Sequence, residues 1–147
     1  MKKIYLLLVV VLCFVGSYAQ TPKSRFVLAT RMTEQFSQSE IDRMYQNDFA
    51  QLFRLNYKML NYALITTKLD GMNCQKMNSV DMYAKSGVVV DEKDMIENGV
   101  NPFQFDFPQD EYRYNVFPMH TAGFYVVVLP KVLYDERMEA LLSTFVY

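Results

Sequence analysis

The sequence predicts a small two-layer α+β domain, with an antiparallel sheet of about 4–5 strands and two main helices packed on one face of that sheet. Two observations favour helices: apolar residues recur every three or four positions once before the middle of the chain and once near its end. A third observation favours the sheet. Short alternating or continuously apolar segments, separated by glycine, proline and aspartate, fill much of the second half.

The N-terminus has the composition of an export signal. Two lysines precede an unbroken apolar stretch from Ile4 to Val15, and small residues follow at Ser17 and Ala19. This order is typical of a secretory signal peptide that is cleaved after Ala19. The apolar stretch is shorter than the roughly 20 residues that a transmembrane helix needs. We therefore expect a signal peptide over residues 1–19, and a single exported domain over residues 20–147 without a transmembrane anchor in the mature chain.

The composition of the mature chain argues against several classes of partner. The full chain has 15 lysines and arginines against 16 acidic residues, and loss of the two signal-peptide lysines leaves 13 against 16, a net charge of −3. A mildly acidic domain lacks the basic surface of a nucleic-acid-binding protein and is not attracted to anionic lipid. Cys74 is the one cysteine after the signal peptide, so no internal disulfide forms in the mature chain.

The first helix is expected from Ser39 to Arg54. Ser37 and Glu40 have the spacing of a capping box just before it. After Arg54 two interpretations stay open: the helix continues, or the chain from Tyr62 to Thr67 forms a strand, which its β-branched residues favour. The side chains that we expect this helix to bury are Ile41, Tyr45, Phe49 and Leu52.

The second half predicts strands and a closing helix. Phe103 to Phe107 and Tyr112 to Val116 alternate apolar with polar residues and predict a hairpin. The run from Phe124 to Leu129 is continuously apolar and predicts a central strand. A helix from Asp135 to Phe145 follows, with its apolar stripe turned toward the sheet. Before the hairpin we expect a strand from Gly87 to Val90 and then a helical turn from Asp91 to Asn98, which Gly99 ends. The side chains that we expect the closing helix to bury are Met138, Leu141 and Leu142.

Cys74 and His120 are the candidate catalytic residues, because they are the one thiol and the one imidazole after the signal peptide. A thiol-dependent hydrolase needs an imidazole that deprotonates its cysteine. Neither residue has a characteristic motif around it, so we treat this hydrolase as the alternative hypothesis. The acidic groups lack the spacing of a calcium loop, and no phosphate-binding glycine loop is present, so no metal and no cofactor is expected.

The aromatic residues suggest a binding surface. Tyr112 and Tyr114 have the spacing that places two side chains on the same face of a strand. Tyrosines on a sheet face or edge bind peptide strands or sugars, although they also pack beneath helices. The sequence therefore favours a non-catalytic binding or accessory domain of the bacterial envelope, located in the periplasm or outside the cell. Its expected partner is another envelope protein or a peptide.

Overall fold

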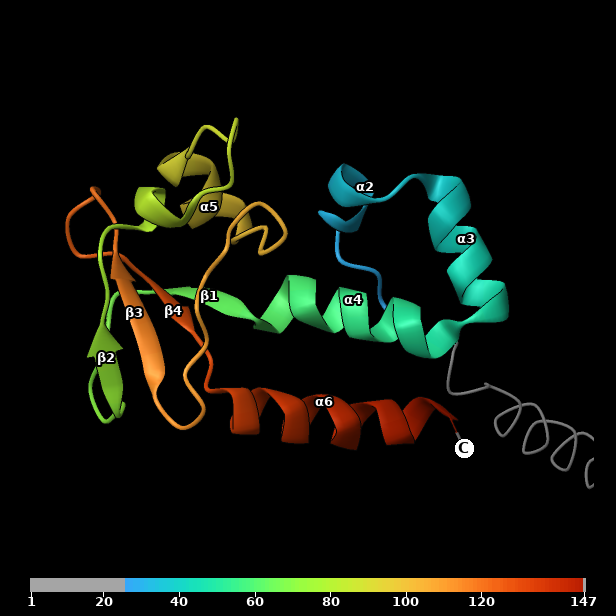
Figure 1. Cartoon of the computed structure of the whole chain (residues 1–147). Coiled ribbons are helices and arrows are strands. Elements are labelled where there is room, and N and C mark those ends of the chain that lie inside the picture. The colour runs from blue at the N-terminus through green and yellow to red at the C-terminus, as the bar shows by residue number, and fades with distance from the viewer. Residues whose placement is uncertain (1–25, 147) are drawn as a thin grey trace, which may run out of the picture.

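The computed structural model describes residues 26–146 (Figure 1). The predicted signal peptide over residues 1–19 and its cleavage site after Ala19 lie outside the described residues. The described chain contains helices and a four-stranded sheet, which confirms the α+β class.

The first half is helical but is not the single helix that the sequence predicted. It forms α2 (Met32–Gln35), α3 (Gln38–Asn47) and α4 (Phe49–Asn61). The capping box is confirmed: the N–H of Glu40 donates to Ser37 Oγ over 3.4 Å, and the N–H of Ser37 donates to Glu40 Oε2 over 2.8 Å. The chain turns sharply at Asp48, where φ is −149° and ψ is 66°, and Asp48 Oδ1 accepts from the N–H of Gln51 to start α4. Asp48 thus ends α3 with its backbone N–H, which donates to the carbonyl oxygen of Met44, and starts α4 with its side chain.

Four short strands form one mixed sheet. They are β1 (Ala63–Thr66), β2 (Cys74–Lys76), β3 (Tyr114–Pro118) and β4 (Tyr125–Val128), in the spatial order β1-β4-β3-β2. The β1–β4 and β3–β4 pairs are antiparallel, whereas β2 and β3 are parallel. The expected all-antiparallel sheet is therefore wrong in one pair. Strand β2 was missed because three residues, two of them polar, carry no periodicity.

The long connection between β2 and β3 contains no strand. It forms the 3₁₀ helix η2 (Val80–Tyr83) and α5 (Glu92–Asn98). The predicted strand from Gly87 to Val90 is absent, and Val89 is 89% exposed. The prediction of a strand from Phe103 to Phe107 is also wrong. This segment forms no strand, and its Phe105 makes a single isolated bridge to Ala84.

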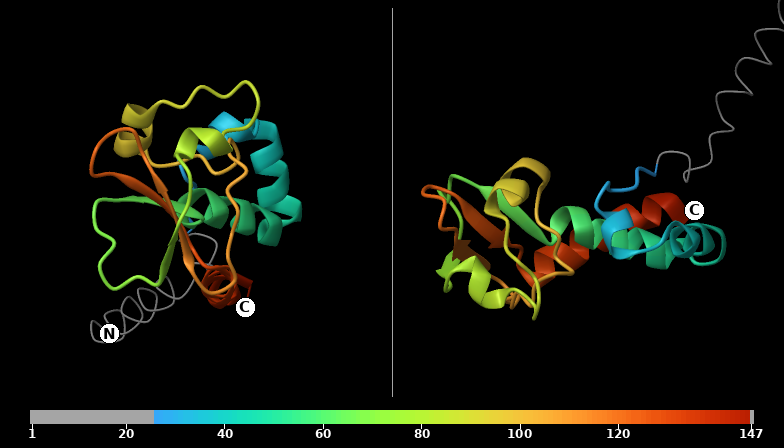
Figure 2. Two further views of the ribbon diagram at one scale, coloured as in Figure 1. Left: turned by 60° about the vertical axis from the view of Figure 1, so that its left-hand side comes forward. Right: turned by 90° about the horizontal axis from the view of Figure 1, so that it is seen from above.

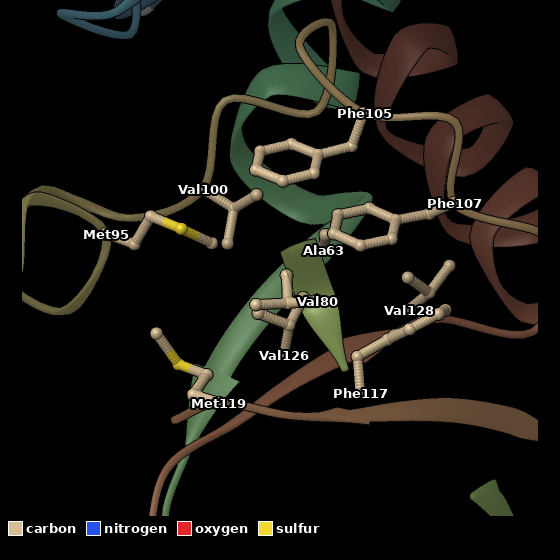
Figure 3. Packing of buried hydrophobic residues seen from close by; sticks show 10 residues of the cluster. All are labelled: Ala63, Val80, Met95, Val100, Phe105, Phe107, Phe117, Met119, Val126 and Val128. Atoms are coloured by element: carbon tan, nitrogen blue, oxygen red, sulfur yellow. The ribbon is translucent and has the colours of Figure 1, made fainter. Parts of the chain in front are cut away.

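The alternating phenylalanines of this connection have a packing role. The rings of Phe105 and Phe107 stack with centroids 4.7 Å apart, and Phe107 lies 4.7 Å from Phe117 of β3. Figure 3 shows these rings above the strand side chains that they cover. The alternation thus arises from two side chains that turn toward one core, and not from a ladder of backbone hydrogen bonds. The buried residues of this cluster are Ala63, Val80, Met95, Val100, Phe105, Phe107, Phe117, Met119, Val126 and Val128.

The two long helices do not cover the sheet, contrary to expectation. Helix α4 leads into β1, and α6 (Lys131–Val146) follows β4. Since Ala63 pairs with Val128, both helices leave the sheet at the same end, and they lie side by side beyond it (Figures 1 and 2). They bury an aromatic cluster between them, consisting of Phe49, Phe53, Tyr57, Leu129, Tyr134 and Leu142. A separate cluster, in which Leu52 is fully buried, joins α2 and α3 to α4.

The predicted helix stripes are correct in part. Ile41, Phe49 and Leu52 are buried, and Met138 and Leu142 pack against the α4–α6 cluster. The two exceptions are Tyr45, which is 41% exposed, and Leu141, which is 47% exposed. Both were assigned to a stripe that faces a sheet. Tyr45 lies on α3 and Leu141 on α6, and both of these helices pack against α4 instead, so they bury a different set of positions.

Adjacent leucines of α6 test this arrangement. We expect Leu142→Ala to lower the free energy of unfolding by about 2–5 kcal/mol, through lost burial and a cavity. Leu141→Ala removes the same atoms from a half-exposed position and should cost about 1 kcal/mol or less. Urea titration of both variants measures the difference, and equal losses would contradict the packing of α4 on α6.

Candidate functional site

Tyr112 and Tyr114 line a surface hollow. Tyr112 lies in the loop before β3 and is 69% exposed, whereas Tyr114 is the first residue of β3 and is half-buried. The hollow has a volume of about 260 Å³. We call this site the tyrosine hollow. The residues that line it are Glu111, Tyr112, Tyr114, Pro130, Val132, Leu133 and Glu136. The two tyrosines that the sequence indicated are thus brought together at one site.

Asp110 fixes the loop that carries Tyr112. Its Oδ1 atom accepts from the N–H groups of Tyr112 at 2.9 Å and Arg113 at 2.8 Å, and its Oδ2 atom accepts from Arg113 Nη2 at 3.1 Å. An aspartate that bonds the amides two and three residues ahead closes a tight turn. These backbone hydrogen bonds, with the Arg113 guanidinium, hold the pKa of Asp110 below its ordinary value.

The first turn of α6 forms the opposite wall. The carbonyl oxygen of Asp110 accepts from the N–H of Lys131 at 2.9 Å, and that of Glu111 accepts from the N–H of Val132 at 3.2 Å. The first amides of a helix have no partner within the helix. The loop therefore satisfies two of them and holds its tyrosine beside Val132 and Glu136.

Two carboxylates, those of Glu111 and Glu136, line the tyrosine hollow. Within the part of the chain that the structure describes, neither Glu111 nor Glu136 forms a salt bridge. Lys131 is engaged by Asp135, which raises the pKa of the lysine, and Glu111 adds to the increase. Two carboxylates, two phenol rings and an apolar floor together suit a cationic side chain, because the rings attract the cation and the floor packs against its methylene stem.

Cys74 and His120 do not form a pair in this fold. Cys74 lies opposite Tyr114 at the start of β3, whereas His120 follows Pro118 at the other end of that strand. Four strand residues span about 13 Å, far beyond the reach of a hydrogen bond. The geometric basis of the thiol-hydrolase hypothesis is therefore missing.

His120 belongs instead to a clasp on the β3–β4 turn. Its Nε2 atom lies 3.0 Å from Asp81 Oδ2 of η2. The N–H groups of His120 and Thr121 and the hydroxyl of Thr121 each donate to the Glu92 carboxylate over 2.6 Å. Burial opposes ionisation of Glu92, but these hydrogen bonds outweigh it and lower its pKa. The clasp fastens the turn to η2 and α5.

The acidic residues beside the two tyrosines and beside His120 were not predicted from the sequence. Glu111 stands beside Tyr112, and this adjacency was the one available signal for its role. Glu136 reaches the tyrosine hollow from a helix that follows in the chain, and Asp81 and Glu92 lie 39 and 28 residues from His120. No spacing rule links residues so distant, because their proximity depends on the whole fold.

Metal binding and membrane insertion find no support in residues 26–146. No three or more histidine, cysteine, aspartate or glutamate side chains in that range are grouped so that they could hold a metal ion. No helix in the same range combines the length and apolar character needed to cross a membrane. The acidic residues at the start of α5 have other roles, since Asp91 caps the helix and Asp94 pairs with Arg31.

No family model, no curated protein and no solved structure matches this chain.

The clasp predicts a shifted titration of the single histidine. The hydrogen bond and charge of Asp81 raise the pKa of His120 above 6.5, and the same bond lowers the pKa of Asp81 below 3.8. The histidine stabilises the fold below pH 6.5 and this contribution is lost as the pH rises through its raised pKa. The ionised aspartate stabilises the fold above pH 3.8, and this contribution is lost as the pH falls through its lowered pKa. The pair therefore has its full effect between pH 3.8 and pH 6.5.

We therefore expect Asp81→Asn to lower the pKa of His120 toward its ordinary value, because Asp81 is the main cause of the increase. NMR titration of the imidazole protons measures this pKa without ambiguity, since the chain has one histidine. Asp70→Asn, an equal change of charge in the loop after β1, is the control. Equal pKa values in the two variants would contradict the contact.

Proposed function

We propose that this chain is an exported protein of the bacterial envelope that binds a protein or peptide partner at the tyrosine hollow and has no catalytic role. The observation that carries the proposal is the hollow itself, in which Tyr112 and Tyr114 stand beside the carboxylates of Glu111 and Glu136, neither of which forms a salt bridge with a described residue. The order of charged, apolar and small residues over 1–19 supports export.

The chemistry of the hollow selects its ligand. A lysine or arginine side chain of a partner pairs with the carboxylates and lies over a phenol ring. An apolar side chain does not neutralise the carboxylates. An exposed ion pair contributes at most about 1 kcal/mol, and a cation–π contact about 0.5–1 kcal/mol. Binding at this one site is therefore weak unless the partner makes further contacts.

The two walls of the tyrosine hollow are held in place by hydrogen bonds, which supports a binding role for this surface. Asp110 holds the loop, and the loop carbonyls hold the start of α6, so both sides of the hollow exist before a ligand arrives. A preformed site loses little conformational entropy on binding. Tyrosine adds contact area with few rotatable bonds, which is why it is common in protein interfaces.

Photo-crosslinking in the native envelope tests the binding surface. We expect a benzophenone amino acid at Tyr112 to give discrete crosslinked products, because Tyr112 borders the hollow. The same amino acid at Val89, an exposed site on another part of the chain, should not. The double change Glu111→Gln with Glu136→Gln should reduce the Tyr112 products several-fold, whereas Asp70→Asn should leave them unchanged. Identical products from both crosslinking positions would contradict the proposal.

Intact-mass analysis of the protein from the envelope tests export. We expect a chain that begins at Gln20, because Ser17 and Ala19 supply the small residues that signal peptidase requires. A cytoplasmic chain that keeps residues 1–19 would show that the export proposal is wrong.

A further inference from the structure

The two carboxylates of the tyrosine hollow come from different walls. Glu111 belongs to the loop before β3 and Glu136 to α6, and both side chains are exposed to solvent. The carbonyl oxygen of Glu111 accepts from the N–H of Val132, and Glu136 follows Val132 by one helical turn, a rise of about 5.4 Å. A ligand with two separated positive charges therefore fits this pair of carboxylates better than a single point charge does.

The cations next to the hollow in the chain are held by other carboxylates. Arg113 donates to Asp110 Oδ2 over 3.1 Å, and Lys131 pairs with Asp135. Glu111 and Glu136 form no salt bridge within residues 26–146. A ligand thus reaches both glutamates without displacing an ion pair of the described chain.

The rest of the hollow is apolar or aromatic. Pro130, Val132 and Leu133 line it together with Tyr112 and Tyr114. A methylene chain is stabilised by contact with an apolar surface, and a phenol ring attracts a cation that lies over its face. The lining therefore suits a ligand that has charged ends and an aliphatic middle.

We propose that the tyrosine hollow binds linear aliphatic diamines and polyamines, with one ammonium group at each glutamate and the methylene chain on the apolar floor. Primary amines of this kind are protonated at neutral pH, as lysine is. The charge on the ligand complements the two carboxylates, which an anionic or a neutral ligand does not. The proposal rests on the same hollow as the proposed function, but it requires no partner protein.

Putrescine, the linear diamine with four carbons, is the probe for NMR titration of the purified protein. We expect it to shift the amide signals of Tyr112, Val132 and Glu136 at millimolar concentration, because exposed ion pairs are weak. Butylamine has one cation on the same carbon chain and should bind about fivefold more weakly. Butanediol has no charge and should not shift these signals. High salt should weaken putrescine binding, since it screens exposed ion pairs.

Matched glutamate variants locate the ligand. Glu111→Gln and Glu136→Gln should each weaken putrescine binding about threefold or more, because each removes one ion pair. In either variant putrescine should also lose its advantage over butylamine. Glu139→Gln is the same change about one turn further along α6 and outside the hollow, and it should alter the affinity less than about twofold.

Three results would overturn the diamine site: no shift of the hollow signals by putrescine or its longer homologues, equal binding of butylamine and putrescine, or unchanged putrescine binding in both glutamate variants. Failure of this proposal is distinguishable from failure of the proposed function. Putrescine binding without crosslinks at Tyr112 would support the diamine site and contradict the protein partner. Crosslinks at Tyr112 without putrescine binding would do the reverse.

Discussion

The antiparallel pairing of β1 with β4 is the contact on which the rest of this structure depends. Four residue pairs, from Ala63 with Val128 to Thr66 with Tyr125, join segments that are far apart in the chain. Because α4 runs into β1 and α6 runs out of β4, this pairing alone places the two long helices side by side. Their aromatic cluster, with Tyr57 and Tyr134 centroids 5.2 Å apart, then closes the half of the molecule that lies beyond the sheet. Burial raises the pKa of the Tyr134 phenol, which keeps it neutral within this cluster.

The same pairing leaves the sheet to be covered by something other than the two long helices. The connection from β2 to β3 does this with Val80, Met95, Phe105 and Phe107. The clasp at His120 anchors the turn between β3 and β4 to that connection through Asp81 and Glu92. The cover is thus tied to the sheet at its turn as well as by apolar packing, although the exposed ion pair adds little to the stability.

The sequence contained enough information for the class of the fold and for its local elements, and too little for their arrangement. The Ser37 cap, the apolar run at β4 and the Gly99 end of α5 each follow from a few neighbouring residues, and all three are present. The phenylalanines at 105 and 107 were misassigned because two rings in one core produce the same alternation as a strand. Tyr112 and Tyr114 line one hollow, but Tyr112 lies in the loop before β3 and not on the strand that the sequence predicted from Tyr112 to Val116. The position of the Glu136 carboxylate depends on the β1–β4 pairing, which places α6.

Side chains that bond to the backbone take the place of regular structure in the connections, and this determines how well the tyrosine hollow is preformed. Asn56 holds the segment at Ala29, and Asn115 Nδ2 donates to the carbonyl oxygen of Pro108 at 2.8 Å, at the start of the loop that carries Tyr112. The Oδ1 atom of Asn115 is buried and has no partner among the described residues. An unpaired buried carbonyl costs about 1–3 kcal/mol, whereas one ordinary hydrogen bond contributes about 0.5–1.5 kcal/mol. By these magnitudes Asn115 does not add net stability, so its contribution is to fix the position of the 108–113 loop, and with it one wall of the tyrosine hollow.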